Sequence, residues 1–563
     1  MTSTNRREHM ADNFVHDAEY YIVELQNREK WAAEDANLDA RLAELKEKHG
    51  TPPNIIHIMF DDLAFGDLGI PQMAAIRGFN TPNIDRMARE GAMFTRMYTE
   101  PACTPSRAAV ITGRHPVRYG MGAVDWPLIF GGLGGDEVTT ANVLSDAGYA
   151  TAFYAKWHLG DIPESYCHNQ GFDEALFLPY NQVSSIWNPI GDAMNAAPGS
   201  AHMRKDNYNE IDKHGLRGDG LVLAIDGKKG EFTREWGTPD PQTYEKVDPE
   251  CERRLMDFVH RNVDEKKPFF VSYWPNLLSF APPPMEPKKS FNGGTAAEAL
   301  VRLDAFIGEL MDELEKLGIA ENTLLVVMAD NGPMVHNPPS LFGMADTIFR
   351  GGKGDVTEGG VRVPAFAWWP GVIKSGEILN DMVHETDLFT TFARLGGATE
   401  NIPTDRVIDG VDQTSLLMNG DAHGRRDWVF IYTGDTLGAT VKGRYKRHWI
   451  GPESGEGAGT SAAFYDLITD PRETSPKLAS LIYSSGQWDR MLIRHELWKE
   501  KYPDKPKARG IPFTGIENAR PETKGIGDTL EQLRKELPFD PLDFIKFNMP
   551  ESLKVTQKVN AVD

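Results

Sequence analysis

Between Asn54 and about residue 425, short apolar runs alternate with segments that have helical spacing and recognisable ends. In TPNIDRMAREG, Thr81 stands at the N-cap position, Pro82 at the first helical position and Gly91 just past the end. A longer helical pattern, TAAEALVRLDAFIGELMDELEKLG, stops at Gly318. This alternation predicts an α/β fold in which a large mixed sheet is sandwiched between helices.

Both ends of the chain depart from the alternation. Residues 1–50 end in a helical pattern at Gly50, and we interpret them as a helical arm that packs on its own subunit or on a partner in a homo-oligomer. Residues 426–502 contain three strand-like runs, WVFIYTG, GATVKGRYKRHWI and AAFYDLITD, followed by a helical pattern. They predict a smaller C-terminal antiparallel sheet with one covering helix. Residues 503–563 are expected to form an extended tail, and residues 51–425 the main domain.

Composition narrows the class of protein. The chain has 563 residues, 40% hydrophobic and 25% charged, as a large globular protein does. Its net charge of -22 argues against nucleic acid as a partner, because nucleic-acid binding draws on clustered Lys and Arg. No apolar run approaches the roughly 20 residues of a membrane span, and none follows the basic N-terminal residues. We therefore expect a cytoplasmic protein without a membrane partner.

Polar side chains follow four of the apolar runs, at the strand ends where open α/β sheets bind ligands. NIIHIMF leads into Asp61 and Asp62, YATAFYA into Lys156, Trp157 and His158, PFFVSYW into Pro275 and Asn276, and LLVVMA into Asp330 and Asn331. Three aspartates and an asparagine offer only oxygen ligands, which suit calcium or magnesium better than zinc. Alone, Asp61 and Asp62 are weak evidence, because an Asp after a strand often caps a turn, although two in a row do so less often. Together with the second pair they predict a metal site.

Three widely spaced cysteines, Cys103, Cys167 and Cys251, fit neither a disulfide framework nor a zinc cluster. The segment CTPSRAAVITG reads as a helix start with Pro105 in the first turn and Cys103 just outside it. Unpaired N–H groups and the positive end of the helix dipole there favour negative charge, so the position suits a nucleophile that attacks an anionic ester. A thiolate prefers softer metals than this oxygen site would hold, so Cys103 is either inert or chemically changed.

Cys103-Thr104-Pro105-Ser106-Arg107, followed by TGRHP, resembles the signature of the formylglycine-dependent type I sulfatases, the arylsulfatase family of the alkaline phosphatase superfamily. Further blocks resemble the family in its own order over roughly residues 53 to 470: NIIHIMFDDLAFGDLG, AKWHLG, VVMADNGP, RGGKGDVTEGGVRVP and FYDLITDPRE.

The resemblance implies a chemistry and a set of roles. Cys103 would be oxidised to formylglycine by a maturation system, and residues 51–425 would be the catalytic domain. One divalent cation, calcium foremost with magnesium or manganese as alternatives, would be held by Asp61, Asp62, Asp330, Asn331 and the modified Cys103. Arg107 would hold the aldehyde hydrate in position, while Lys156, His158 and Lys353 would bind the sulfate or transfer protons. The substrate would be a small organic sulfate ester, an aryl ester foremost.

The chain departs from the family pattern in two places. Many relatives carry a histidine, thought to protonate the leaving group, where this chain reads NLLSFAPPP, with Ser279 or Pro283 at that position. His336 is the nearest alternative donor in sequence, and Ala155 stands where a glycine is usual.

Two other functions stay open. Phosphonate monoester and phosphodiester hydrolases share the modified cysteine but usually show a histidine where Asn331 follows Asp330. A non-catalytic homologue that binds sulfated ligands is the third alternative. His57 is expected to be a packed strand histidine, and Cys167 and Cys251 structural thiols.

Overall fold

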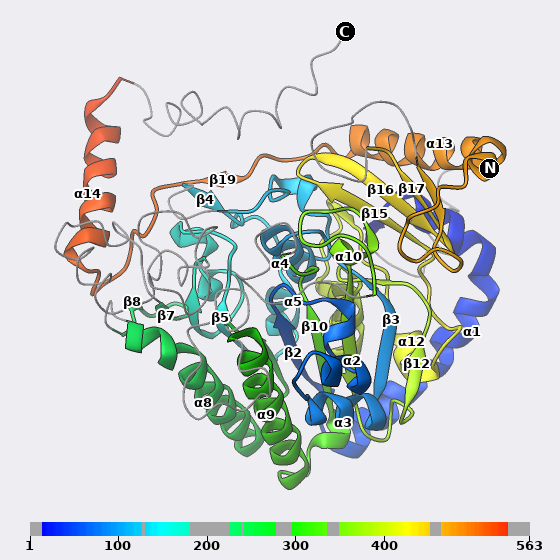
Figure 1. Ribbon diagram of the computed structural model, residues 1–563. Coiled ribbons are helices and arrows are strands. Elements are labelled where there is room, and N and C mark those ends of the chain that lie inside the picture. The colour runs from blue at the N-terminus through cyan, green and yellow to red at the C-terminus, as the bar shows by residue number, and fades with distance from the viewer. Residues whose placement is uncertain are drawn as a thin grey trace, which may run out of the picture.

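A mixed sheet of eleven strands forms the centre of the molecule (Figure 1). The computed structural model describes residues 14–125, 130–180, 224–237, 241–276, 295–334, 348–450 and 463–538. In spatial order the strands are β12 (Glu377–Leu379), β3 (Ala92–Tyr98), β11 (Arg362–Trp368), β10 (Thr323–Ala329), β2 (Asn54–Phe60), β9 (Phe269–Trp274), β5 (Ala150–Lys156), β6 (Glu174–Leu178), β7 (Ile225–Lys228) and β8 (Thr233–Glu235), with β13 (Val383–His384) also paired to β3.

The middle of this sheet is parallel. Strands β10, β2, β9, β5 and β6 all run in one direction, whereas β11 and β7 pair antiparallel on either side of them. The register aligns the strand ends: Ala329 lies opposite Phe60, and Ala155 opposite Trp274. The residues that follow these strands therefore emerge along one edge of the sheet.

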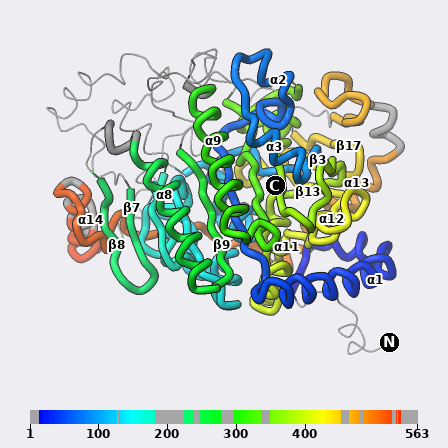
Figure 2. The backbone as a smooth tube through the Cα atoms, turned by 90° about the horizontal axis from the view of Figure 1, so that it is seen from below, coloured from blue at the N-terminus to red at the C-terminus, as the bar shows by residue number. Residues whose placement is uncertain are grey.

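Helices cover both faces of the sheet, and the alternation of side chains along β9 shows how. Phe269 and Tyr273 point to one face, where they meet Phe258 of α8 (Pro241–Glu265) and Phe306 of α9 (Thr295–Lys316). Phe270 points to the opposite face and meets Phe392 of α11 (Asp387–Leu395). In Figure 2, α8 and α9 run side by side. The predicted α/β sandwich is confirmed.

Shorter elements complete this body. They are α2 (Pro71–Ile76), α3 (Pro82–Glu90), α4 (Cys103–Thr112), α5 (Thr140–Asp146), α10 (Glu358–Val361), α12 (Thr414–Asn419), and the paired strands β1 (Val15–His16) and β14 (Val407–Ile408).

Helix α3 begins at Pro82 as predicted, but its cap comes from another helix. Thr81 occupies the N-cap position without a capping side-chain hydrogen bond. Instead, Asp304 of α9 accepts hydrogen bonds from the backbone N–H of Asn83, at 3.1 Å, and of Ile84, at 2.8 Å. The carboxylate thus satisfies donors that the helix itself cannot and ties α3 to α9.

Replacing Asp304 with alanine is expected to lower the free energy of unfolding by about 1–2 kcal/mol, because buried helix donors lose their acceptor. Urea denaturation measures the change. Asp312→Ala is the matched control on the same helix: the side chain of Asp312 is 70% exposed in its ion pair with Arg86, and its loss should cost at most about 0.5 kcal/mol. Equal losses in the two variants would contradict the capping role.

The C-terminal antiparallel sheet is confirmed, but it has four strands where three runs were predicted. They are β15 (Trp428–Thr433), β16 (Thr436–Lys442), β17 (Tyr445–His448) and β18 (Phe464–Asp466). The run GATVKGRYKRHWI folds back on itself because Gly443 adopts a φ of 58°, which glycine reaches without strain. Helix α13 (Leu478–Lys501) packs on β18 through Trp488 and Phe464.

At the N-terminus, α1 (Ala18–His49) packs on its own chain, along α12 and α13. Arg394 of α11 forms ion pairs with Asp35 and Asp39 of α1, and Arg425 lies over the ring of Trp31. Contact with a second subunit stays a prediction.

The C-terminal tail, expected to be extended, is so only in part. Ala508–Arg509 form β19, which pairs with β4 (Gly131–Gly132), but Pro521–Glu536 form the helix α14 at the far side of the molecule from α13 (Figure 1). Proline at the first helical position and the helix-forming run that follows explain this helix. Among the described residues, no helix is both long and apolar enough to cross a membrane.

Candidate active site

The strand-end residues come together as the sequence predicts. Asp61 and Asp62 follow β2, Asp330 and Asn331 follow its neighbour β10, and Lys156 ends β5. The strand order and register place these ends side by side. All five side chains are buried, and the backbone N–H of Asp62 donates to Asp330 Oδ1 at 3.1 Å.

Cys103 enters this group from helix α4. It is the first helical residue, with Ala102 at the N-cap, so it lies one position further into the helix than predicted. Pro105 fits the first turn because its missing N–H would have no helical partner there. The Cys103 sulfur lies 3.3 Å from Asp61 Oδ1 and 2.7 Å from Lys353 Nζ. The Cys103 side chain therefore ends between a carboxylate and an ammonium group.

Arg107, one helical turn further on, holds the carboxylates in place. Its Nη2 lies 3.0 Å from Asp61 Oδ1 and 2.7 Å from Asp330 Oδ2, and its Nη1 donates to the Lys156 carbonyl at 2.9 Å. The guanidinium is fully buried. Such a buried ion pair costs several kcal/mol of solvation and is favourable only with this complete set of partners.

Two lysines flank the sulfur. Lys156 Nζ lies 2.6 Å from Asp61 Oδ1 and 3.6 Å from Cys103 Sγ. Lys353, which precedes α10, lies 2.8 Å from Asp62 Oδ1. Its side chain is 16% exposed, so this lysine borders the opening of the site. The pair can neutralise an anionic group placed beside Cys103.

The hydrogen-bond partner of His158 is not indicated by any pattern in the sequence. Nε2 of His158 lies 2.9 Å from the carbonyl oxygen of Asp125. Burial, together with the charges of Lys156 and Arg107, lowers the pKa of His158 well below its usual value, so the ring is neutral. Nε2 must donate to the carbonyl, which leaves Nδ1 as a free proton acceptor among the described residues.

Asp125 itself is anchored on three sides. Its N–H donates to Thr104 Oγ1, beside Cys103, at 3.0 Å, and its carboxylate pairs with Lys507 of the C-terminal tail. No spacing in the sequence connects Lys507 to the site, so sequence reasoning missed this support.

Three residues at the site have left-handed backbones, a region that disfavours side chains with a Cβ. The φ angles are 58° at Asp62, 82° at Ala155 and 61° at His158. Asp and His tolerate this region better than most residues do. The φ of Ala155 explains why glycine is the usual residue there.

The oxygen atoms of the site fit a hard divalent cation. Ligand atoms of Asp61, Asp62, Cys103 and Asp330 lie within 4.8 Å of one another. Asp61 Oδ2 and Asn331 Oδ1 are buried and have no hydrogen-bond partner in the described part of the chain, while Asn331 Nδ2 donates to Asp62 Oδ1 at 2.6 Å. Buried acceptors without partners are costly, and a cation would satisfy them.

The pKa shifts and the charge balance of the site agree with a bound divalent cation. Burial, and then the charge of Asp61, raise the pKa of Asp330 to about 7. Burial acts in the same direction on Asp61, but Lys156 and Arg107 outweigh it and lower the pKa of that carboxyl. The three carboxylates are matched by Arg107 and two lysines, so a divalent cation would leave a positive site suited to an anionic substrate.

His57, Cys167 and Cys251 lie in the core and not in the cluster. His57 is packed in β2 between Trp274 and Phe392, and burial lowers its pKa to about 3. Cys167 and Cys251 are buried free thiols elsewhere in the core. Ser279, Pro283 and His336 lie outside the described residues.

Comparison with known proteins agrees with this geometry. Residues 53–398 match the family model described as Sulfatase. The chain is 32% identical over 417 residues to N-acetylgalactosamine-6-sulfatase from Canis lupus familiaris, covering 71% of this chain and 72% of that protein. It is 33% identical over 454 residues to arylsulfatase A from Homo sapiens, covering 75% and 82%.

Among solved structures, the PsFucS1 sulfatase from Pseudoalteromonas sp. superimposes with a TM-score of 0.74 at 30% identity, covering 84% of this chain and 96% of that one. The matched region contains the whole cluster from Asp61 to Lys353. The chain therefore belongs to the sulfatase family, whose members hydrolyse sulfuric esters.

Proposed function

We propose that this protein hydrolyses organic sulfate monoesters, aryl sulfates foremost, through a formylglycine made from Cys103. The observation that carries the proposal is the position of Cys103 Sγ, at a helix start, 3.3 Å from Asp61 Oδ1, 2.7 Å from Lys353 Nζ and 3.6 Å from Lys156 Nζ. An oxygen nucleophile at this place would face cationic groups that neutralise a sulfate.

The nucleophile requires maturation of the chain. The β-carbon of Cys103 loses its sulfur as sulfide and gains one oxygen at the aldehyde level, with an external oxidant supplied by the maturation system. Water then adds to the aldehyde and gives two hydroxyls on one carbon. Asp61, Asp62, Asp330 and Asn331 would hold a divalent cation, calcium foremost, which supplies Lewis-acid stabilisation of negative charge.

The chain's own residues carry the proton and charge movements. One hydroxyl oxygen attacks sulfur and releases its proton to solvent, the bond from sulfur to the alcohol oxygen breaks, and the departing oxygen takes a proton from solvent, while Lys156 and Lys353 neutralise the sulfuryl oxygens. Nδ1 of His158 then takes the proton of the second hydroxyl. The carbon–oxygen bond to the sulfate breaks, the aldehyde re-forms and inorganic sulfate leaves. Throughout the reaction, the hydrogen bonds from Arg107 hold the carboxylates of Asp61 and Asp330 in position.

Sulfate is favoured over a phosphonate or phosphodiester substrate by Asn331, which follows Asp330 where hydrolases of those esters usually carry a histidine. The test is competition between 4-nitrophenyl sulfate and a 4-nitrophenyl phosphonate monoester on one purified preparation. We expect kcat/KM to be higher for the sulfate. A higher value for the phosphonate would overturn the proposed substrate, and no turnover of either would favour a binding protein.

Turnover is expected to fall steeply as the leaving group becomes more basic, since Ser279 or Pro283 replaces the family histidine. A general acid contributes on the order of 10² to 10⁴ in rate, and alkyl sulfates should be slower than 4-nitrophenyl sulfate by at least this factor. A series of substituted phenyl sulfates measures the slope, with Cys103→Ala as the background. A shallow slope would mean that another residue protonates the leaving group.

A further inference from the structure

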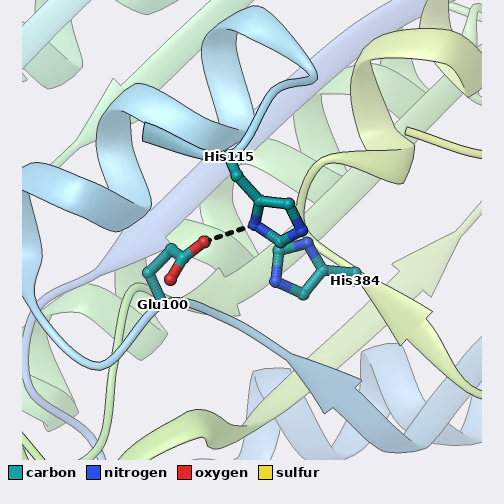
Figure 3. A group of neighbouring side chains, drawn as sticks. All are labelled: Glu100, His115 and His384. Carbon is teal, nitrogen blue, oxygen red and sulfur yellow. Dashed lines mark hydrogen bonds and ion pairs between the residues drawn. The ribbon is translucent and has the colours of Figure 1, made fainter. Parts of the chain in front are cut away.

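A second group of buried ligand-type side chains flanks helix α4 and shares no residue with the metal-binding cluster of the sulfate site (Figure 3). Glu100 precedes α4, His115 follows it, and His384 belongs to β13. Their exposed fractions are 1%, 2% and 1%. His115 Nδ1 lies 2.8 Å from Glu100 Oε1, and one ligand atom from each residue lies within 4.8 Å of the others. The proposed reaction uses none of the three.

The first argument for a ligand is the unbalanced charge of this group. Glu100 is joined by Glu385, whose Oε1 accepts a hydrogen bond from the Glu100 N–H at 2.8 Å. Both glutamates are buried, and in the described part of the chain neither forms an ion pair with Lys or Arg. The buried carboxylate of Glu100, whose partner is the imidazole of His115 and not a lysine or arginine, is costly in the interior, and a bound cation would offset that cost.

The second argument is an imidazole nitrogen without a partner. His384 Nδ1 lies 2.9 Å from Thr386 Oγ1, whereas its Nε2 is buried and has no hydrogen-bond partner among the described residues. The two imidazole rings lie next to each other, with ring centroids 5.2 Å apart, and in Figure 3 the dashed line joins His115 to the Glu100 carboxylate. The Thr386 N–H also lies 3.4 Å from His384 Nδ1. A proton on Nδ1 that is donated to Thr386 Oγ1 would leave the lone pair of Nε2 for a metal ion.

We propose that Glu100, His115 and His384 bind one divalent transition-metal ion, with zinc as the ion that fits their donors. Two imidazoles and one carboxylate form a familiar zinc ligand set, unlike the oxygen-only strand ends that suit a hard cation. Zinc ligands at about 2.0–2.1 Å from the ion lie about 3.4 Å apart in a tetrahedron, so small side-chain rotations would bring these atoms into place. The ion would link both ends of α4 to β13.

Metal analysis of the purified full-length protein tests the site. After exposure to zinc and removal of the excess, we expect one zinc per chain in wild type and in Asp330→Asn, and at least tenfold less in His384→Gln. His423→Gln is the matched control, because His423 pairs with Glu34 at 2.8 Å but belongs to no candidate metal-binding group among the described residues, and this variant should keep the zinc. Unchanged zinc content in His384→Gln would overturn the assignment.

Anomalous scattering at the zinc edge gives a second readout that needs no variant. A wild-type crystal soaked in zinc should show a peak between Glu100, His115 and His384. A peak only at Asp61 and Asp330, or no peak, would overturn the assignment and leave the group as a histidine hydrogen-bonded to a glutamate beside a second histidine. Because zinc content and scattering do not depend on turnover, this site and the proposed sulfate chemistry can fail separately.

Discussion

Replacing Cys103 with alanine is expected to reduce sulfate ester turnover by a factor on the order of 10⁴ to 10⁶, because the reaction loses its nucleophile. The fold should survive, since Cys103 makes no disulfide and alanine fits the first turn of α4. Rates with 4-nitrophenyl sulfate measure the loss. Cys167→Ala is the matched control: Cys167 is equally buried but lies outside the cluster, so its variant should keep kcat within a few fold.

Peptide mass spectrometry tests directly whether Cys103 has been converted to formylglycine. In an active preparation, the peptide that contains Cys103 should carry an aldehyde in place of the thiol. Cys103→Ser should stall after the first transfer, because serine has no second hydroxyl with which to expel the sulfate, and the peptide should gain one SO3 group. An active preparation whose Cys103 is entirely thiol would refute the formylglycine mechanism.

Asp330→Asn is expected to lower both calcium occupancy and turnover, the latter by at least about 10²-fold. The substitution keeps the shape of the side chain but removes one charge from a site that already lacks partners for Asp61 Oδ2 and Asn331 Oδ1. It also removes the carboxylate charge that faces Arg107, whose Nη2 lies 2.7 Å from Asp330 Oδ2 in the present structure. Elemental analysis and rates measured over a calcium titration check the two effects together.

The control for Asp330 is Asp304→Asn. Asp304 is also a buried aspartate, and burial raises its pKa to about 6, but it caps α3 and does not contact the cluster. Its variant should lose stability while keeping calcium and turnover. Full calcium occupancy in Asp330→Asn would remove Asp330 from the ligand set.

The parts of the site that follow strands could be predicted from sequence. Asp61, Asp330 and Lys156 each come directly after a mainly apolar run, and parallel strands align such ends without further information. Lys353 follows no strand, and the family resemblance identified it as a candidate site residue. The fold class was within reach for the same reason, because apolar runs and capped helices alternate along the chain.

Contacts that join distant segments could not be predicted. Asp304 caps α3 from another helix, Lys507 supports Asp125 from the C-terminal tail, and His384 of β13 meets Glu100, which follows the paired strand β3. None of these pairs has a local pattern, because each partner is only one polar residue in an ordinary helix, strand or loop. The fourth strand of the C-terminal sheet was missed because a single glycine, Gly443, reverses a run that otherwise reads as continuous.

The left-handed backbone at Asp62, Ala155 and His158 has a consequence for how the site can evolve. Valine, isoleucine and threonine are strongly disfavoured at these three positions, whatever chemistry they might offer, because branching at Cβ conflicts with such a backbone. Adaptation to new esters must therefore proceed through other positions. A mutagenesis library aimed at new substrates will yield more folded variants if it leaves these three codons fixed.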